Sequence, residues 1–147
     1  MLLADYAQAA EGKLNVIGAG WTLTGPQPVP HAIGLIFEVP WDQANDQIHF
    51  RLELVDQDGE PFMLPTPEGP QPLHTEGQFE VGRPAGIKRG TPLNFTIALN
   101  IGAQPLAPGE RYEWRLTVNG ETHEDWRAAF SVRPAGPQQP FAIPPAG

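Results

Sequence analysis

Alternation of hydrophobic and polar positions recurs along the whole chain and predicts strands rather than helices. The clearest alternation runs from Leu93 to Ile101, where every second residue is apolar. Similar patterns cover Ile48 to Leu54 and Ile33 to Val39. A period of two places one face of each strand against a core. In the strand that begins at Ile33, Ile36 makes both faces nearly apolar, so we expect this strand to be central in its sheet.

The stretch from Leu106 to Gly120 predicts a corner, a strand and a tight turn. Pro108 and Gly109 are a turn signal, because proline presets φ and glycine accepts a positive φ. Apolar residues then alternate from Tyr112 to Val118, and Asn119-Gly120 is the commonest two-residue hairpin turn. The returning strand alternates from Trp126 to Val132.

The pattern Leu106-x-Pro108-Gly109-x-x-Tyr112 resembles the tyrosine corner of immunoglobulin-like and fibronectin-type-III-like sandwiches. The resemblance implies that Tyr112 hydrogen-bonds back to the corner and that Trp114 lies in the core. The alternative is that Tyr112 is a core aromatic residue in an unrelated hairpin. The antibody branch is excluded because the chain has no cysteine. The predicted fold class is all-β: a two-sheet antiparallel immunoglobulin-like β-sandwich with an N-terminal hairpin and a proline-rich C-terminal tail.

The N-terminal residues predict that hairpin, with a strand over 2–10, a turn at 11–13 and a returning strand over 14–17. This part of the chain is similar to an uncharacterised family of short, mostly actinobacterial proteins whose N-termini read ADxAQ…EGKL…GxGW. The matching positions are Ala4, Asp5, Ala7, Gln8, Glu11, Gly12, Lys13, Leu14, Gly18, Gly20 and Trp21. That family carries no known activity, so the resemblance implies nothing about function.

Prolines and glycines predict the connections. Asp42 is the expected cap of a short turn, and Pro61 begins a short edge strand, because proline cannot donate to a ladder. Residues 65–76 and 83–90 are predicted loops, and a short strand is expected over 78–81. We divide the chain into a β-sandwich domain, 1–133, and a proline-rich extended tail, 134–147. The tail has five prolines, no charge, and two large apolar residues, Phe141 and Ile143.

Composition excludes several classes of protein. The net charge is −8 with two lysines, which argues against binding to nucleic acid or to an anionic membrane. The absence of cysteine excludes disulfides, thiolate catalysis and zinc–thiolate sites. The N-terminus lacks the basic region of a signal peptide, and no segment approaches the ~18 apolar residues of a membrane span. We therefore expect a cytoplasmic protein.

Candidate chemistry is sparse. Ser131, the single serine, lies mid-strand without a nucleophile motif. The four histidines, His31, His49, His74 and His123, are not spaced as zinc ligands, and we expect them to be solvated surface residues. We predict no catalytic, cofactor or metal site. An enzyme using carboxylates, or His49 with His123 across strands, is the least favoured alternative.

These observations favour a non-enzymatic structural or interaction module. We expect it to bind itself, as a homo-oligomer, or another protein, through exposed edges at the N-terminal strand and near Pro61 and through the tail. Trp41, at a strand end, is the best candidate for a surface anchor in the sandwich, and Phe141 and Ile143 are the tail anchors. The alternative is a small-ligand or peptide-binding domain with a site near Trp41 and the 65–76 and 83–90 loops.

Overall fold

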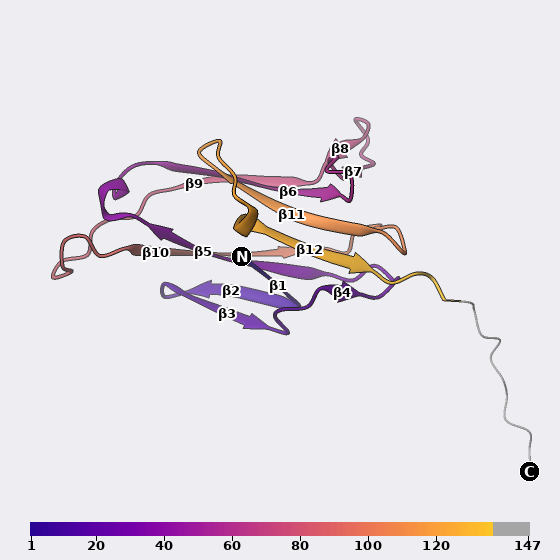
Figure 1. Ribbon diagram of the computed structural model, residues 1–147, viewed down its shortest axis with the longest axis horizontal. Coiled ribbons are helices and arrows are strands. Elements are labelled where there is room, and N and C mark those ends of the chain that lie inside the picture. Colours follow the sequence, from indigo (N-terminus) through magenta and orange to yellow (C-terminus); the bar gives the residue numbers. More distant parts are fainter. Residues whose placement is uncertain (137–147) are drawn as a thin grey trace, which may run out of the picture.

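The computed structural model describes residues 1–136 and confirms the predicted all-β class (Figure 1). One sheet has three strands in the order β1 (Leu2–Ala4), β5 (His31–Val39) and β10 (Leu93–Ile101). Both pairings are antiparallel, and β5 is the central strand, as its two apolar faces predict. Among the described residues, no helix is long and apolar enough to cross a membrane.

The second sheet has five strands. Their order is β4 (Leu23–Thr24), β12 (Arg127–Val132), β11 (Arg111–Val118), β6 (Ile48–Asp56) and β9 (His74–Phe79). All neighbours are antiparallel except β12 and β4, which run parallel. The first sheet thus takes β1 from the start of the chain, and the second takes β4 a short distance later.

Two small hairpins complete the fold, together with the single-turn 3₁₀ helices η1 (Trp41–Gln43) and η2 (Glu124–Trp126). The pair β7 (Met63–Leu64) and β8 (Gln71–Pro72) projects from one end of the sandwich (Figure 1). The pair β2 (Tyr6–Ala10) and β3 (Lys13–Ile17) covers the outer face of the three-stranded sheet as a third layer (Figure 1).

The core lies between the two sheets. Its inward positions follow the predicted period of two, so that Leu52, Leu54 and Ile33 are completely buried. Aromatic rings fill both ends: Phe37, Phe50 and Phe79 pack with one another, and Phe130 packs with Trp21 and Tyr112. Most of these rings lie at inward positions of the alternating strands, whereas Trp21 lies outside the strands.

The corner and the hairpin turn predicted from 106–120 are both present. The Ala107 N–H donates to the Tyr112 hydroxyl at 2.9 Å, and Trp114 is 1% exposed. Gly109 follows Pro108 with a φ of 83°, and its N–H donates to the Val132 carbonyl. Asn119 and Gly120 both have positive φ, as a type I′ hairpin turn requires.

Several predicted boundaries are wrong. The strand expected over 2–10 breaks at Asp5, where the chain changes partner from β5 to β3. Gly18 permits this break, because a Cβ at that position would collide with the Asp5 carboxylate. The loop expected over 65–76 contains β8 and the start of β9, which pairs with β6 from His74 onwards. Asp42 makes no capping hydrogen bond, and η1 is preceded by Pro40.

Candidate interaction surface

Strand β5 is paired on both edges along only part of its length. Strand β10 pairs with all of His31–Val39, whereas β1 pairs with Ala32, Ile33 and Gly34. Beyond Gly34, on the β1 side, Leu35–Val39 faces no strand and makes no backbone hydrogen bond within residues 1–136. Because successive residues of a strand direct their N–H and C=O groups to alternate edges, every second residue here presents an unpaired donor and acceptor.

A cleft of about 430 Å³ opens beside this edge, between the two sheets. Most of its walls are apolar, and two carboxylates, Glu38 and Glu121, lie among its lining residues. The apolar lining comes from both sheets and from η2: Met1, Leu35, Ile36, Phe37, Val39, Pro40, Ile48, Phe79, Leu116, Val118 and Trp126. The volume falls within the ~300–1,000 Å³ typical of ligand pockets.

The opposite wall of the cleft is closed. Strand β12 pairs with β11 over Arg111–Arg115, so the end of β11 keeps β6 on one edge but has no strand on the β12 side. The hairpin tip satisfies this end instead: the Thr122 hydroxyl donates to the Leu116 carbonyl at 2.8 Å, and Val118 and Glu121 exchange two backbone hydrogen bonds. Helix η2 then places Trp126 on the cleft wall, against the ring of His123.

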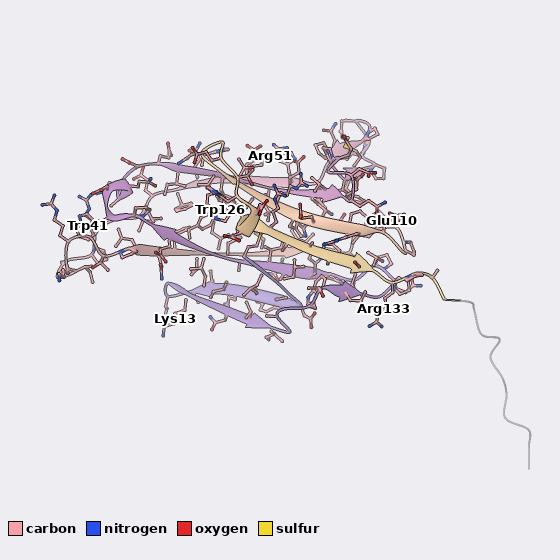
Figure 2. All side chains as sticks on the ribbon, viewed as in Figure 1. Lys13, Trp41, Arg51, Glu110, Trp126 and Arg133 are labelled. Atoms are coloured by element: carbon pink, nitrogen blue, oxygen red, sulfur yellow. The ribbon has the colours of Figure 1, made fainter. Side chains whose placement is uncertain are left out.

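Trp41 lies at one end of the sandwich, directly after β5 (Figure 2). The Arg83 guanidinium lies 4.9 Å from the ring centroid and donates to the Trp41 carbonyl at 2.8 Å. The structure therefore brings Trp41 to the start of the 83–90 loop. The 65–76 segment lies at the other end of β6, where Leu73 bonds to Leu54, so the structure does not assemble the three predicted parts of a ligand site (Figure 1).

His49 and His74 lie on the outer face of the five-stranded sheet, with Glu76 between them. Their Nε2 atoms are 3.5 and 3.8 Å from the Glu76 carboxylate, which also pairs with Arg51. The hydrogen bond from Arg51 lowers the pKa of Glu76. These are exposed cross-strand pairs of the kind that line solvated sheets. His123 instead packs against Trp126, while His49 lies beside Glu76.

His31 is 5% exposed, so the prediction of a solvated surface residue is wrong for this histidine. It packs among Trp21, Trp114 and Phe130, and its Nε2 accepts a hydrogen bond from Trp114 Nε1 at 3.0 Å. Burial lowers the pKa of His31, which favours the neutral ring that this hydrogen bond requires. The alternation contained the signal, because His31 is in phase with the inward residues of β5.

Another hollow within residues 1–136, about 440 Å³ beside Gly18 and Trp21, matches the cleft in volume but is more open to solvent. A cavity beside Trp21 and His31 is about 20 Å³, too small for anything larger than a water molecule. The same residues contain no group of three His, Asp or Glu side chains placed to hold a metal ion. Two of the predicted interaction residues, Phe141 and Ile143, lie outside the described residues.

The described chain is thus an all-β protein in which the free edge of β5 at Leu35–Val39 lies beside an apolar cleft, while the outermost strands β9 and β10 each pair on one edge only. It belongs to a family of unknown function, DUF6941, whose family model matches residues 1–133. This match confirms the predicted membership of an uncharacterised family. No curated protein and no solved structure matches the sequence significantly.

Proposed function

We propose that this protein is a non-enzymatic structural or interaction module that self-associates through strand edges and its C-terminal tail. The observation that carries the proposal is the unpaired edge of β5 at Leu35–Val39. An exposed strand edge is a template for another strand, whose main-chain groups supply affinity while side-chain pockets supply specificity. The apolar cleft beside this edge provides such a pocket.

The fold in this proposal is immunoglobulin-like. In that fold, strands A, B and E share one sheet and strands C, F and G the other. The order β1-β5-β10 corresponds to A-B-E, and β6, β11 and β12 correspond to C, F and G. The hydrogen bond between Ala107 and Tyr112 supports the same assignment, because it has the form of a tyrosine corner. The β2–β3 hairpin is then an insertion between two halves of the first strand.

The proposal also covers the cellular location of the protein and its binding partners. We place the protein in the cytoplasm, with another copy of itself as its first partner and a different protein as the alternative. No cofactor, nucleic acid or membrane has a role, since the charge is −8 and the one cluster of histidines is an exposed ladder of cross-strand pairs. The actinobacterial origin of the family and its N-terminal motif remain predictions.

The test is the mass of the full-length chain in solution, by light scattering over about a hundredfold range of concentration. We expect dimers or larger assemblies. Changing Ile36→Lys, 56% exposed at the open edge, should reduce them to monomers of 16.0 kDa. The matched control is Ile17→Lys, 66% exposed on the hairpin, which should assemble normally. A monomeric wild-type chain at every concentration would refute self-association.

A peptide-binding or small-ligand-binding domain is the second candidate function. It is favoured by the volume of the cleft, about 430 Å³. Under this alternative, the full-length chain stays monomeric and Ile36→Lys has no effect on its mass. A screen of peptides and small molecules by the fluorescence of Trp126, on the cleft wall, would then identify the ligand class.

A further inference from the structure

We propose that the occupant of the β5 cleft is the C-terminal tail of a second copy of this chain. In this arrangement, Phe141, Ala142 and Ile143 pair with the open edge of β5, and the two large side chains point into the cleft. This inference rests on the proposed self-association. It specifies the segment of one copy that binds and the site on the other copy where it binds.

The sequence of the tail suits an added edge strand. Phe141, Ala142 and Ile143 are three consecutive residues with backbone N–H groups, between Pro140 and Pro144. With the period of two of a strand, Phe141 and Ile143 share one face, and Ala142 faces the other way. Flanking prolines are tolerated on an edge strand and stop further strands from adding to it.

The dimensions of the open edge also fit. Strand β1 occupies three positions on β5, and five residues, 35–39, remain without a partner on that side. Leu35, Phe37 and Val39 point inward from this edge and line the cleft. A second short strand placed in line with β1 would therefore complete the edge of the three-stranded sheet. Its two apolar side chains would lie between the sheets, against Trp126 and Leu116.

Charge supports the tail over most other segments of the chain. Glu38 and Glu121 are both among the lining residues, so an acidic strand would be repelled from the cleft. The chain carries 17 acidic residues, but 134–147 contains no Asp, Glu, Lys or Arg. The tail can therefore enter between these carboxylates without adding charge.

The course of β12 favours a donor from a second copy. Trp126 lines the cleft, but β12 then runs away from it, so that Arg133 lies at the far end of the sandwich (Figure 2). There Val132 shares a small cavity with His31, the first residue of β5. A tail returning within its own chain would run parallel to β5 and would have to pass β1. A tail from another copy enters at the open end, antiparallel to β5, which is the stronger pairing.

Cysteine cross-linking in the full-length chain tests this assignment, because the natural sequence contains no cysteine. One preparation carries Glu38→Cys and is labelled with ¹⁵N, and a second, unlabelled, carries Ala142→Cys. The two are mixed and oxidised, and the disulfide-linked products are identified by intact mass. A disulfide requires Cα atoms within about 7 Å, which adjacent strands satisfy. The matched control replaces Glu38→Cys by Asp58→Cys, an exposed acidic residue in the turn after β6.

We expect the mixed dimer of Glu38→Cys and Ala142→Cys to exceed the control dimer on the order of tenfold. Adding Phe141→Ser and Ile143→Ser to the Ala142→Cys chain should reduce it to the control level. Three results would overturn the proposal. One is equal yields from Glu38→Cys and Asp58→Cys. The second is a predominance of Glu38→Cys homodimers, which would indicate pairing of two β5 edges. The third is an intramolecular disulfide in the monomeric double variant Glu38→Cys/Ala142→Cys.

Failure of this assignment is distinguishable from failure of the proposed function. If light scattering detects assemblies but the mixed disulfide is absent, self-association stands and the tail is not the donor. If the wild-type chain is monomeric and the intramolecular disulfide forms, the tail binds its own domain and self-association fails as well.

Discussion

The two halves of β5 differ in how completely they are covered. Around Ala32, Ile33 and Gly34, the strand has β10 on one edge, β1 on the other, a core on one face and the β2–β3 hairpin on the other face. From Leu35 to Val39, the strand keeps β10 and the core but has no second edge partner among the described residues. One continuous strand therefore contributes both to the most enclosed part of the molecule and to its open cleft.

Side-chain size on the outer face of β5 explains where the cover ends. Ala32 and Gly34 are small enough for the hairpin to approach, and a Cβ on Gly34 would lie 2.8 Å from Leu14 Cδ2. The next two outward residues are Ile36 and Glu38, both exposed. The hairpin therefore packs closely on β5 where the outward residues are small, and this contact ends where they become large or charged.

The largest expected difference between the halves comes from the same substitution at two isoleucines. Ile33→Ala, at a completely buried position, should lower the free energy of unfolding by about 2–5 kcal/mol, because it removes buried methyl groups and leaves a cavity. Ile36→Ala, at a position 56% exposed, should change it by less than about 0.5 kcal/mol. Urea unfolding measures both, and equal losses would contradict the contrast between the halves.

The attachment of the hairpin depends on Asn100, which pairs with Ala32 across β10 and β5. Its side chain accepts from the Ala7 N–H at 3.2 Å and donates to the Ala7 carbonyl at 2.8 Å. Asn100→Ala should cost about 1–3 kcal/mol and accelerate hydrogen exchange at Ala7. Asn94→Ala, on the same strand without such bonds, is the matched control. Unchanged exchange at Ala7 would show that the hairpin is held by packing alone.

The buried start of β5 should make stability dependent on pH. Because burial lowers the pKa of His31, the unfolded chain binds a proton at a higher pH than the folded chain does. This contribution to stability is complete above the unfolded value near 6.5. It is lost as the pH falls below that value.

Replacing the histidine tests this dependence. His31→Leu should cost about 1–2 kcal/mol at pH 7.5, since Trp114 Nε1 loses its acceptor, and should remove part of the pH dependence. Urea unfolding at pH 7.5 and pH 5.5 measures both effects. An identical pH dependence in wild type and variant would assign it to other groups.

The smallest expected effect concerns the closed wall of the cleft. Thr122→Val removes the donor to the Leu116 carbonyl and should cost about 0.5–1.5 kcal/mol. Thr117→Val, on the outer face of β11, is the control and should have little effect. If Thr122→Val changes the free energy of unfolding as little as Thr117→Val does, the hydrogen bond from Thr122 does not stabilise the end of β11. The two walls of the cleft then differ less in stability than their hydrogen bonds suggest.

The sequence predicted the strands whose alternation is long, and it failed where pairing overrides local composition. β5, β6, β10 and β11 lie where the period of two places them, and the turn at Asn119-Gly120 has the predicted positive φ values. The proline-rich stretch 65–76 instead contributes β8, which pairs with β7, and the start of β9, because β6 offers a long partner that outweighs the poor strand propensity of these residues.

The open edge could not be predicted, because it depends on where β1 ends relative to β5. Apolar residues occur on both sides of Asp5 within 2–10, so the sequence indicates one strand. The change of strand partner at Asp5 therefore leaves no signal in the sequence other than the glycine at position 18. Trp126, by contrast, was expected in the returning strand and lies in η2 on the cleft wall. Its displacement follows from the extra residues between Gly120 and Arg127.

The parallel pairing of β4 with β12 has a mechanical consequence. A pull on Arg133 along the axis of β12 acts on a strand held by β11 on one side and by β4 on the other, with further bonds from Val132 to Glu110 and Gly109. These hydrogen bonds lie across the direction of the force, so they share the load and must break together rather than one after another. A chain joined to its neighbours by its tail would therefore resist tension at the point where the tail leaves the sandwich.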